Sequence, residues 1–83
     1  MLKDKEPRPP KVPLSDLKKG QKGTVECLLP QKEKDLQKYL ILGLVPGENI
    51  IVLHHNPLYV IQVGHTQIAL DQEGASAIYV SLN

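Results

Sequence analysis

Apolar residues alternate with polar ones through much of the chain, and this period of two is typical of half-buried β-strands. Between residues 22 and 29, the side chains of Val25, Cys27 and Leu29 fall on one face of such a strand, and Pro30 ends it. We expect that shared face to be buried. Alternation or short apolar runs predict further strands at residues 50–53, 59–63, 67–70 and 78–82.

One segment follows a different period. Leu36 and Leu40 lie four residues apart, which places them on one face of a helix, and we expect a short helix over residues 31–42. Gly43 suits the left-handed residue that ends a helix, and Leu44 can fold back as the apolar contact that accompanies such an end. The helix is therefore expected to stop abruptly at this glycine, before the next strand begins.

Further turns complete the expected order of elements. Pro46-Gly47 favours a type II turn, because glycine tolerates positive φ at its third position, and Gly64 begins a tight reversal between two strands. Asp71 can cap one helical turn that runs through Ala77. About five strands, one short helix and this final helical turn predict a mainly β protein, built as a small, partly closed barrel.

The amino-terminal residues differ in composition from the rest. Residues 1–13 hold four prolines among charged side chains, so we expect a flexible or polyproline-like leader that cannot offset the entropy of ordering. A PxxP ligand is the alternative interpretation of these prolines. A chain of 83 residues makes one domain, which we place at residues 14–83. The prolines of the leader are Pro7, Pro9, Pro10 and Pro13.

Composition and charge argue against several classes of protein. The net charge of +1 disfavours binding by phosphate neutralisation, although the lysines keep a small nucleic-acid-binding barrel open as an alternative. No apolar run approaches the ~20 residues that cross a bilayer, so direct membrane insertion is not expected. The lone Cys27 excludes an internal disulfide and fits a reducing cytoplasm. The sequence has no glycine-rich phosphate loop and no serine–histidine motif, and we expect neither an enzyme nor a cofactor.

Short motifs follow one another in order along the folded part. They are Leu14-x-x-Leu17, Leu40-x-Leu42-Gly43-Leu44-x-Pro46-Gly47, Ile50-x-Val52-Leu53, Asn56-Pro57-Leu58, Val63-Gly64, Ile68-Ala69-Leu70, Glu73-x-Ala75 and Ile78-x-Val80. Taken together, this set resembles the FeoA family, the small cytoplasmic partners of a bacterial ferrous iron transporter. The resemblance implies an SH3-like barrel, which agrees with the strand count given above.

The resemblance also implies a function and a partner. The protein would be an accessory protein of Fe(II) uptake that docks on the cytoplasmic GTP-binding domain of a large, FeoB-like membrane transporter and modulates its assembly or activity. It would then be cytoplasmic and recruited to the inner face of the plasma membrane. A regulatory domain is the alternative, since the same barrel occurs at the carboxyl end of metal-dependent iron repressors. A homo-oligomer is also open, because residues 59–63 could present an exposed hairpin edge.

A chain this small leaves some apolar side chains uncovered, and a contiguous apolar patch would mark a partner-binding surface. For the leucines of the helix, the alternative is that they seal the end of the barrel. We predict a patch formed by helix and turn residues, namely Leu36, Leu40, Leu44, Pro57, Leu58 and Tyr59.

His54 and His55 are weak candidates for metal ligands. Imidazole nitrogen suits Fe(II), and a transient site would combine one of these histidines with a carboxylate. Because neighbouring residues of a strand point to opposite faces, the two side chains are poorly placed to bind one ion together. We therefore expect a structural role for this pair and no resident metal.

Overall fold

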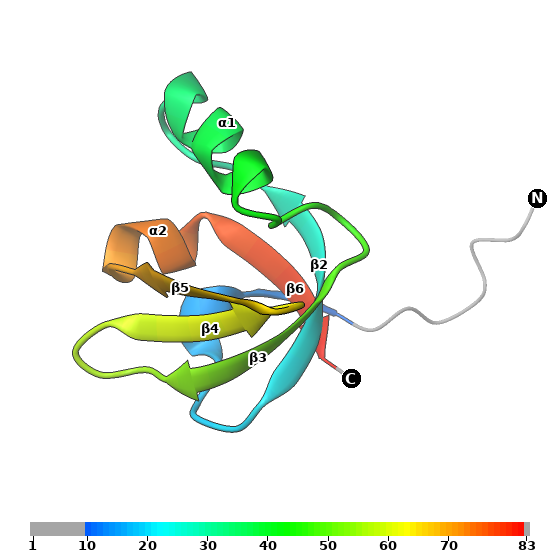
Figure 1. The fold of residues 1–83 in the computed structure, drawn as a ribbon, viewed down its shortest axis with the longest axis vertical. Helices are drawn as coiled ribbons and strands as arrows, with labels where there is room; N and C mark the ends of the chain where they lie inside the picture. Colours follow the sequence, from blue (N-terminus) through cyan, green and yellow to red (C-terminus); the bar gives the residue numbers. More distant parts are fainter. Residues whose placement is uncertain (1–9, 83) are drawn as a thin grey trace, which may run out of the picture.

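Six antiparallel strands form one sheet in the computed structural model, which describes residues 10–82 (Figure 1). The strand order is β1-β6-β2-β3-β4-β5, so β1 and β5 are the two edges and the barrel is only partly closed. The predicted fold class, a mainly β protein with a partly closed barrel, is confirmed. The strands are β1 (Lys11–Pro13), β2 (Lys22–Leu28), β3 (Asn49–His54), β4 (Tyr59–Val63), β5 (Thr66–Leu70) and β6 (Ile78–Leu82).

Short helical segments connect these strands. The short helix and the final helical turn that the sequence predicts are both present, and α2 lies against β5 and the 3-10 turn η2. Asp71 caps α2, because its Oδ1 accepts a hydrogen bond from the Gly74 N–H at 2.8 Å. In Figure 1, α1 stands apart at one end of the sheet. The segments are η2 (Leu14–Asp16), α1 (Glu33–Ile41) and α2 (Gln72–Ser76).

The core is aliphatic, as a chain without Phe or Trp requires. Burial of these side chains is the main favourable term in the stability of so small a sheet. Tyr39 and Tyr59 add their rings at its margins. The largest fully buried side chains are Leu14, Leu17, Val25, Leu44, Val52, Ile61, Ile78 and Val80.

Strand β1 corrects part of the predicted leader. Residues 11–13 were expected to belong to a flexible segment, but they pair with β6 in the register Lys11↔Ser81 and Pro13↔Tyr79. The reason is long-range: β6 supplies the hydrogen-bonding partner, and Val12 packs against the core. A proline is tolerated here because β1 is an edge strand. The other residues of the predicted leader, apart from Pro10, lie outside the described range.

The end of α1 has the backbone pattern of a Schellman motif. The Leu44 N–H donates to the Tyr39 carbonyl oxygen at 3.0 Å, and the Gly43 N–H donates to the Leu40 carbonyl oxygen at 3.1 Å. Gly43 has φ of 99°, which a side chain would disfavour. Leu44 folds back and is fully buried. The helix thus ends where the sequence predicts.

A type II turn then starts β3 beside β2. The Glu48 N–H donates to the Val45 carbonyl oxygen at 3.1 Å, and Gly47 at the third position has φ of 97°. The Gly47 N–H also donates to the Val25 carbonyl oxygen at 2.8 Å. The turn is therefore hydrogen-bonded to β2, the strand with which β3 pairs.

A β-bulge in β2 corrects the predicted burial of this strand. The register with β6 shifts between Val25 and Cys27, which adds one residue, Glu26, to β2. The Ser81 hydroxyl donates to Glu26 Oε2 at 2.8 Å and holds the bulge. Beyond the bulge the alternation changes phase: Val25 is buried, Cys27 is only partly buried, and Leu29 is 64% exposed. The three residues therefore do not share a buried face.

We expect Gly43→Ala to lower the free energy of unfolding by about 1–2 kcal/mol, because alanine pays the steric penalty of the left-handed conformation. Gly43→Asn should cost less, since asparagine tolerates that conformation better. Urea unfolding followed by circular dichroism measures both values. An alanine variant as stable as the wild type would contradict the role assigned to this residue.

Candidate protein-binding surface

Two of the six residues predicted to contact a partner are buried, and for them the prediction is wrong. Leu44 is fully buried because the motif at the end of α1 directs it into the core. Tyr59 is 8% exposed, and its hydroxyl proton is shared between two acceptors, the Ser15 carbonyl oxygen and Gln72 Oε1, each 3.1 Å from the hydroxyl oxygen. These bonds attach β4 to η2 and α2, so the ring is part of the structure and not of a docking surface.

The other four residues reach the surface in two separate regions. Leu40 of α1 is 38% exposed, and Leu36 is half-buried one turn earlier. Pro57 and Leu58 are exposed in the loop between β3 and β4, with Leu58 at 46%. Figure 1 shows α1 and this loop well apart. The structure therefore does not bring the predicted residues together in one patch.

Three exposed apolar side chains, Leu29, Ile41 and Leu82, are not among the predicted residues, and the first two are the most exposed. Ile41, at the end of α1, is 84% exposed, and Leu29, just after β2, is 64% exposed. Ile41 shares its helix face with Lys34 and Lys38, and a face that carries two lysines is expected to be exposed to solvent. The exposure of Ile41 could therefore have been predicted from this spacing. The exposure of Leu29 depends on the bulge in β2, which alternation alone does not reveal.

The predicted hairpin edge is also wrong. Residues 59–63 form β4, which pairs with β3 on one side and β5 on the other, so its backbone groups are not available to a second copy. Among the strands that the structure describes, the two edges of the sheet are β1 and β5.

Neither histidine of the candidate pair belongs to a ligand cluster. His54 ends β3 and His55 follows it, and both are exposed. His55 Nδ1 accepts a hydrogen bond from the Lys19 N–H at 3.2 Å, which occupies that nitrogen. Within residues 10–82 no three His, Cys, Asp or Glu side chains lie close enough together to hold a metal ion.

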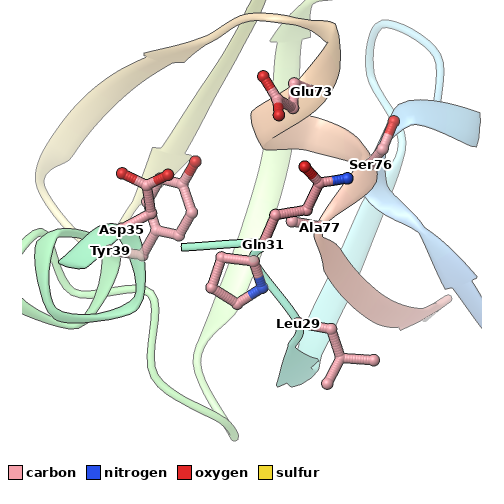
Figure 2. A pocket seen from close by; sticks show the side chains of 8 residues that line it. Leu29, Gln31, Asp35, Tyr39, Glu73, Ser76 and Ala77 are labelled. Atoms are coloured by element: carbon pink, nitrogen blue, oxygen red, sulfur yellow. The ribbon is translucent and has the colours of Figure 1, made fainter. Parts of the chain in front are cut away.

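A cavity of about 140 Å³, which no sequence motif indicated, lies where α1 and α2 face each other (Figure 2). Its walls include Leu29, Pro30, Asp35, Tyr39, Glu73 and Ala77.

The side chain of Tyr39, in α1, lies against α2. Its ring is 8% exposed, and its hydroxyl oxygen lies 2.9 Å from where a Cβ on Gly74 would be. Only a glycine at that position leaves room for the hydroxyl in its observed place.

The electrostatics of this cavity are negative. Burial raises the pKa of Tyr39 above its ordinary value, and the negative charges of Asp35, Asp71 and Glu73 raise it further. The same potential that opposes a phenolate would attract a positively charged group.

The model of the FeoA domain family matches residues 12–82. The chain belongs to the FeoA family. The match runs from β1 to the end of β6 and so includes the whole sheet. A comparison with curated protein sequences gave no match. Within the described residues, no helix is long and apolar enough to span a membrane.

Solved structures place this FeoA-family chain among known folds. It is similar to an iron uptake regulatory protein, FeoA, with 33% identity and a TM-score of 0.80, over 89% of this chain and 100% of that protein. It is also similar to Stenotrophomonas maltophilia FeoA complexed with zinc, with 26% identity and a TM-score of 0.74, over 82% of this chain and 87% of that one. That protein is described as a prokaryotic SH3 domain protein, so the expected SH3-like fold is confirmed.

The repressor likeness concerns the fold alone. T. acidophilum IdeR is 20% identical with a TM-score of 0.82, over 94% of this chain. The chain spans only 36% of the length of that protein.

We expect Tyr39 to ionise above pH 10, its ordinary value, because its neighbourhood opposes the phenolate. The difference in phenolate absorbance between the wild type and Tyr39→Phe, followed against pH, gives the titration curve of Tyr39. The folded state keeps a proton that the unfolded chain loses, so the free energy of unfolding should fall as the pH rises past 10. Asp35→Asn should lower the midpoint, whereas Glu48→Gln, outside the cavity, should not move it. A Tyr39 midpoint at or below 10 would contradict this assignment.

Proposed function

We propose that this protein is an accessory protein of bacterial ferrous iron uptake that docks on the cytoplasmic GTP-binding domain of a membrane Fe(II) transporter. The observation that carries the proposal is the family match over residues 12–82. It is supported by the similarity to an iron uptake regulatory protein, FeoA, whose whole length this chain covers. The protein would act in the cytoplasm, at the inner face of the membrane.

The exposed apolar side chains of α1 support binding as the mode of action. Leu40 and Ile41 are uncovered on a helix that stands at one end of the sheet (Figure 1). A short helix that presents apolar side chains can lie in a groove of a partner, which is a common form of protein recognition. We place the docking surface at Leu36, Leu40 and Ile41, with the Pro57–Leu58 loop as a separate, second contact. Binding would modulate the assembly or activity of the transporter and involves no catalysis by this chain.

A regulatory role as in the iron repressors is less well supported. IdeR is only 20% identical to this chain, and a similarity at that level supports a common fold and not a common function. A nucleic-acid-binding barrel would depend on phosphate contacts, which a net charge of +1 does not favour.

We expect Leu40→Asp to weaken binding to the GTP-binding domain of the transporter from the same organism by about tenfold, the effect of losing a buried apolar contact worth about 1.4 kcal/mol. Isothermal titration calorimetry with the two purified proteins measures the dissociation constant. Leu58→Asp should have a smaller effect if the loop is only a second contact.

Gln37→Asp is the matched control, since it adds the same charge to an exposed position of the same helix. Its binding should be close to that of the wild type. Equal affinities for all variants would reject the surface on α1. No binding by the wild-type protein would reject the proposed partner itself.

A further inference from the structure

The cavity between α1 and α2 combines acidic and apolar walls. Asp35 comes from α1 and Glu73 from α2, and Figure 2 shows these carboxylates on different sides of the space. Leu29 and Pro30 contribute apolar surface. The lining contains no lysine and no arginine, and neither carboxylate forms an ion pair with another residue of the described part. The negative charge of the cavity is therefore not neutralised by the residues around it.

The hydroxyl of Tyr39 is an acceptor that the other described residues leave open at the cavity. The side chain is 92% buried, being 8% exposed, yet its hydroxyl has no hydrogen bond to any residue within 10–82. It is directed toward α2, where it lies against Gly74 at the cavity wall. Within residues 10–82 no buried side-chain oxygen lacks a hydrogen-bond partner, so this unpaired hydroxyl is in contact with solvent at the cavity. It can therefore accept a hydrogen bond from a group that enters the cavity.

The size of the cavity limits what can enter. Pockets for drug-sized ligands measure about 300–1,000 Å³, and this one measures about 140 Å³. A cavity of about 150 Å³ in a protein core accommodates a molecule the size of benzene. One long side chain of another protein, with a compact head group, is a suitable occupant. The exposure of Leu29 at the rim, at 64%, leaves the entrance open.

We propose that this cavity receives an arginine side chain of the protein partner. The guanidinium group would donate to the carboxylates of Asp35 and Glu73 and to the hydroxyl of Tyr39, while its methylenes pack on Leu29 and Pro30. Arginine fits better than lysine, because its planar group carries five N–H donors that can serve acceptors on two elements at once. The inference deepens the proposed function, on which it rests for the identity of the partner, by naming the chemistry of one contact.

The test uses the cavity alone and no transporter. The isotopically labelled full chain is titrated with N-acetyl-arginine amide, and with N-acetyl-citrulline amide, which has the same shape and no charge, while amide shifts are followed by NMR. We expect saturable shifts at Gln31, Asp35 and Glu73 with the arginine probe. The dissociation constant should be about fivefold higher for the citrulline probe, the scale of one partly exposed ion pair.

A pair of variants separates the cavity from general charge effects. Asp35→Asn with Glu73→Gln should weaken arginine binding by about fivefold or more, since both charged acceptors are lost. The control, Glu33→Gln with Glu48→Gln, changes the net charge equally at exposed positions outside the lining and should bind as the wild type does. The amide spectra also report whether each variant is folded.

Equal binding of the two probes, equal weakening by both variant pairs, or shifts away from the cavity would each overturn the proposal. Saturation of the same amides by Mn²⁺ or Zn²⁺ alone, with exclusion of the arginine probe, would overturn it in favour of a metal site. The outcome is independent of the Leu40→Asp experiment. Loss of transporter binding there, together with no arginine binding here, would leave the proposed function standing and reject only this contact.

Discussion

The backbone at Gly43 fixes the position of α1 on the sheet. Leu44 lies fully in the core, and its N–H is bonded to the carbonyl of Tyr39 in the last turns of the helix. A single left-handed residue therefore connects a buried leucine to a helix that makes few other contacts with the sheet. Tyr39, which lines the cavity, lies against Gly74 of α2, while Leu40 and Ile41 are exposed to solvent. The cavity and the exposed apolar side chains of α1, which are the two proposed binding features, therefore both depend on the turn at Gly43.

The features that could be predicted are those determined by local backbone chemistry. The end of α1 at Gly43 and the cap of α2 by Asp71 each depend on residues only a few positions apart. Residues 59–63 and 78–82, predicted as strands, coincide with β4 and β6, because turn-forming residues delimit both runs clearly. Such elements carry their own signals in the sequence.

The features that could not be predicted arise from distant partners. Alternation across β2 did not reveal the bulge, because the bulge is a shift in the pairing with β6, where Ser81 forms a hydrogen bond with Glu26. Strand β1 needs β6 in the same way. Leu58, in the loop before β4, is uncovered, whereas Tyr59, the first residue of β4, is covered. The hydrogen-bond partners that decide the second case lie in η2 and α2. The cavity likewise lies between α1, α2 and the residues after β2, which no sequence motif connects.

The placement of β6 between β1 and β2 has a consequence for how the chain acquires its structure during synthesis. Both neighbours of β6 are made long before it; until residues 78–82 arrive, β2 can pair only with β3 and β1 has no partner strand. A ribosome-bound fragment that stops before Ile78 would expose an unpaired side of β2 and leave β1 without any neighbour. Pairings of such long sequence separation are slow to form, so β6 is expected to be the last strand to join the sheet.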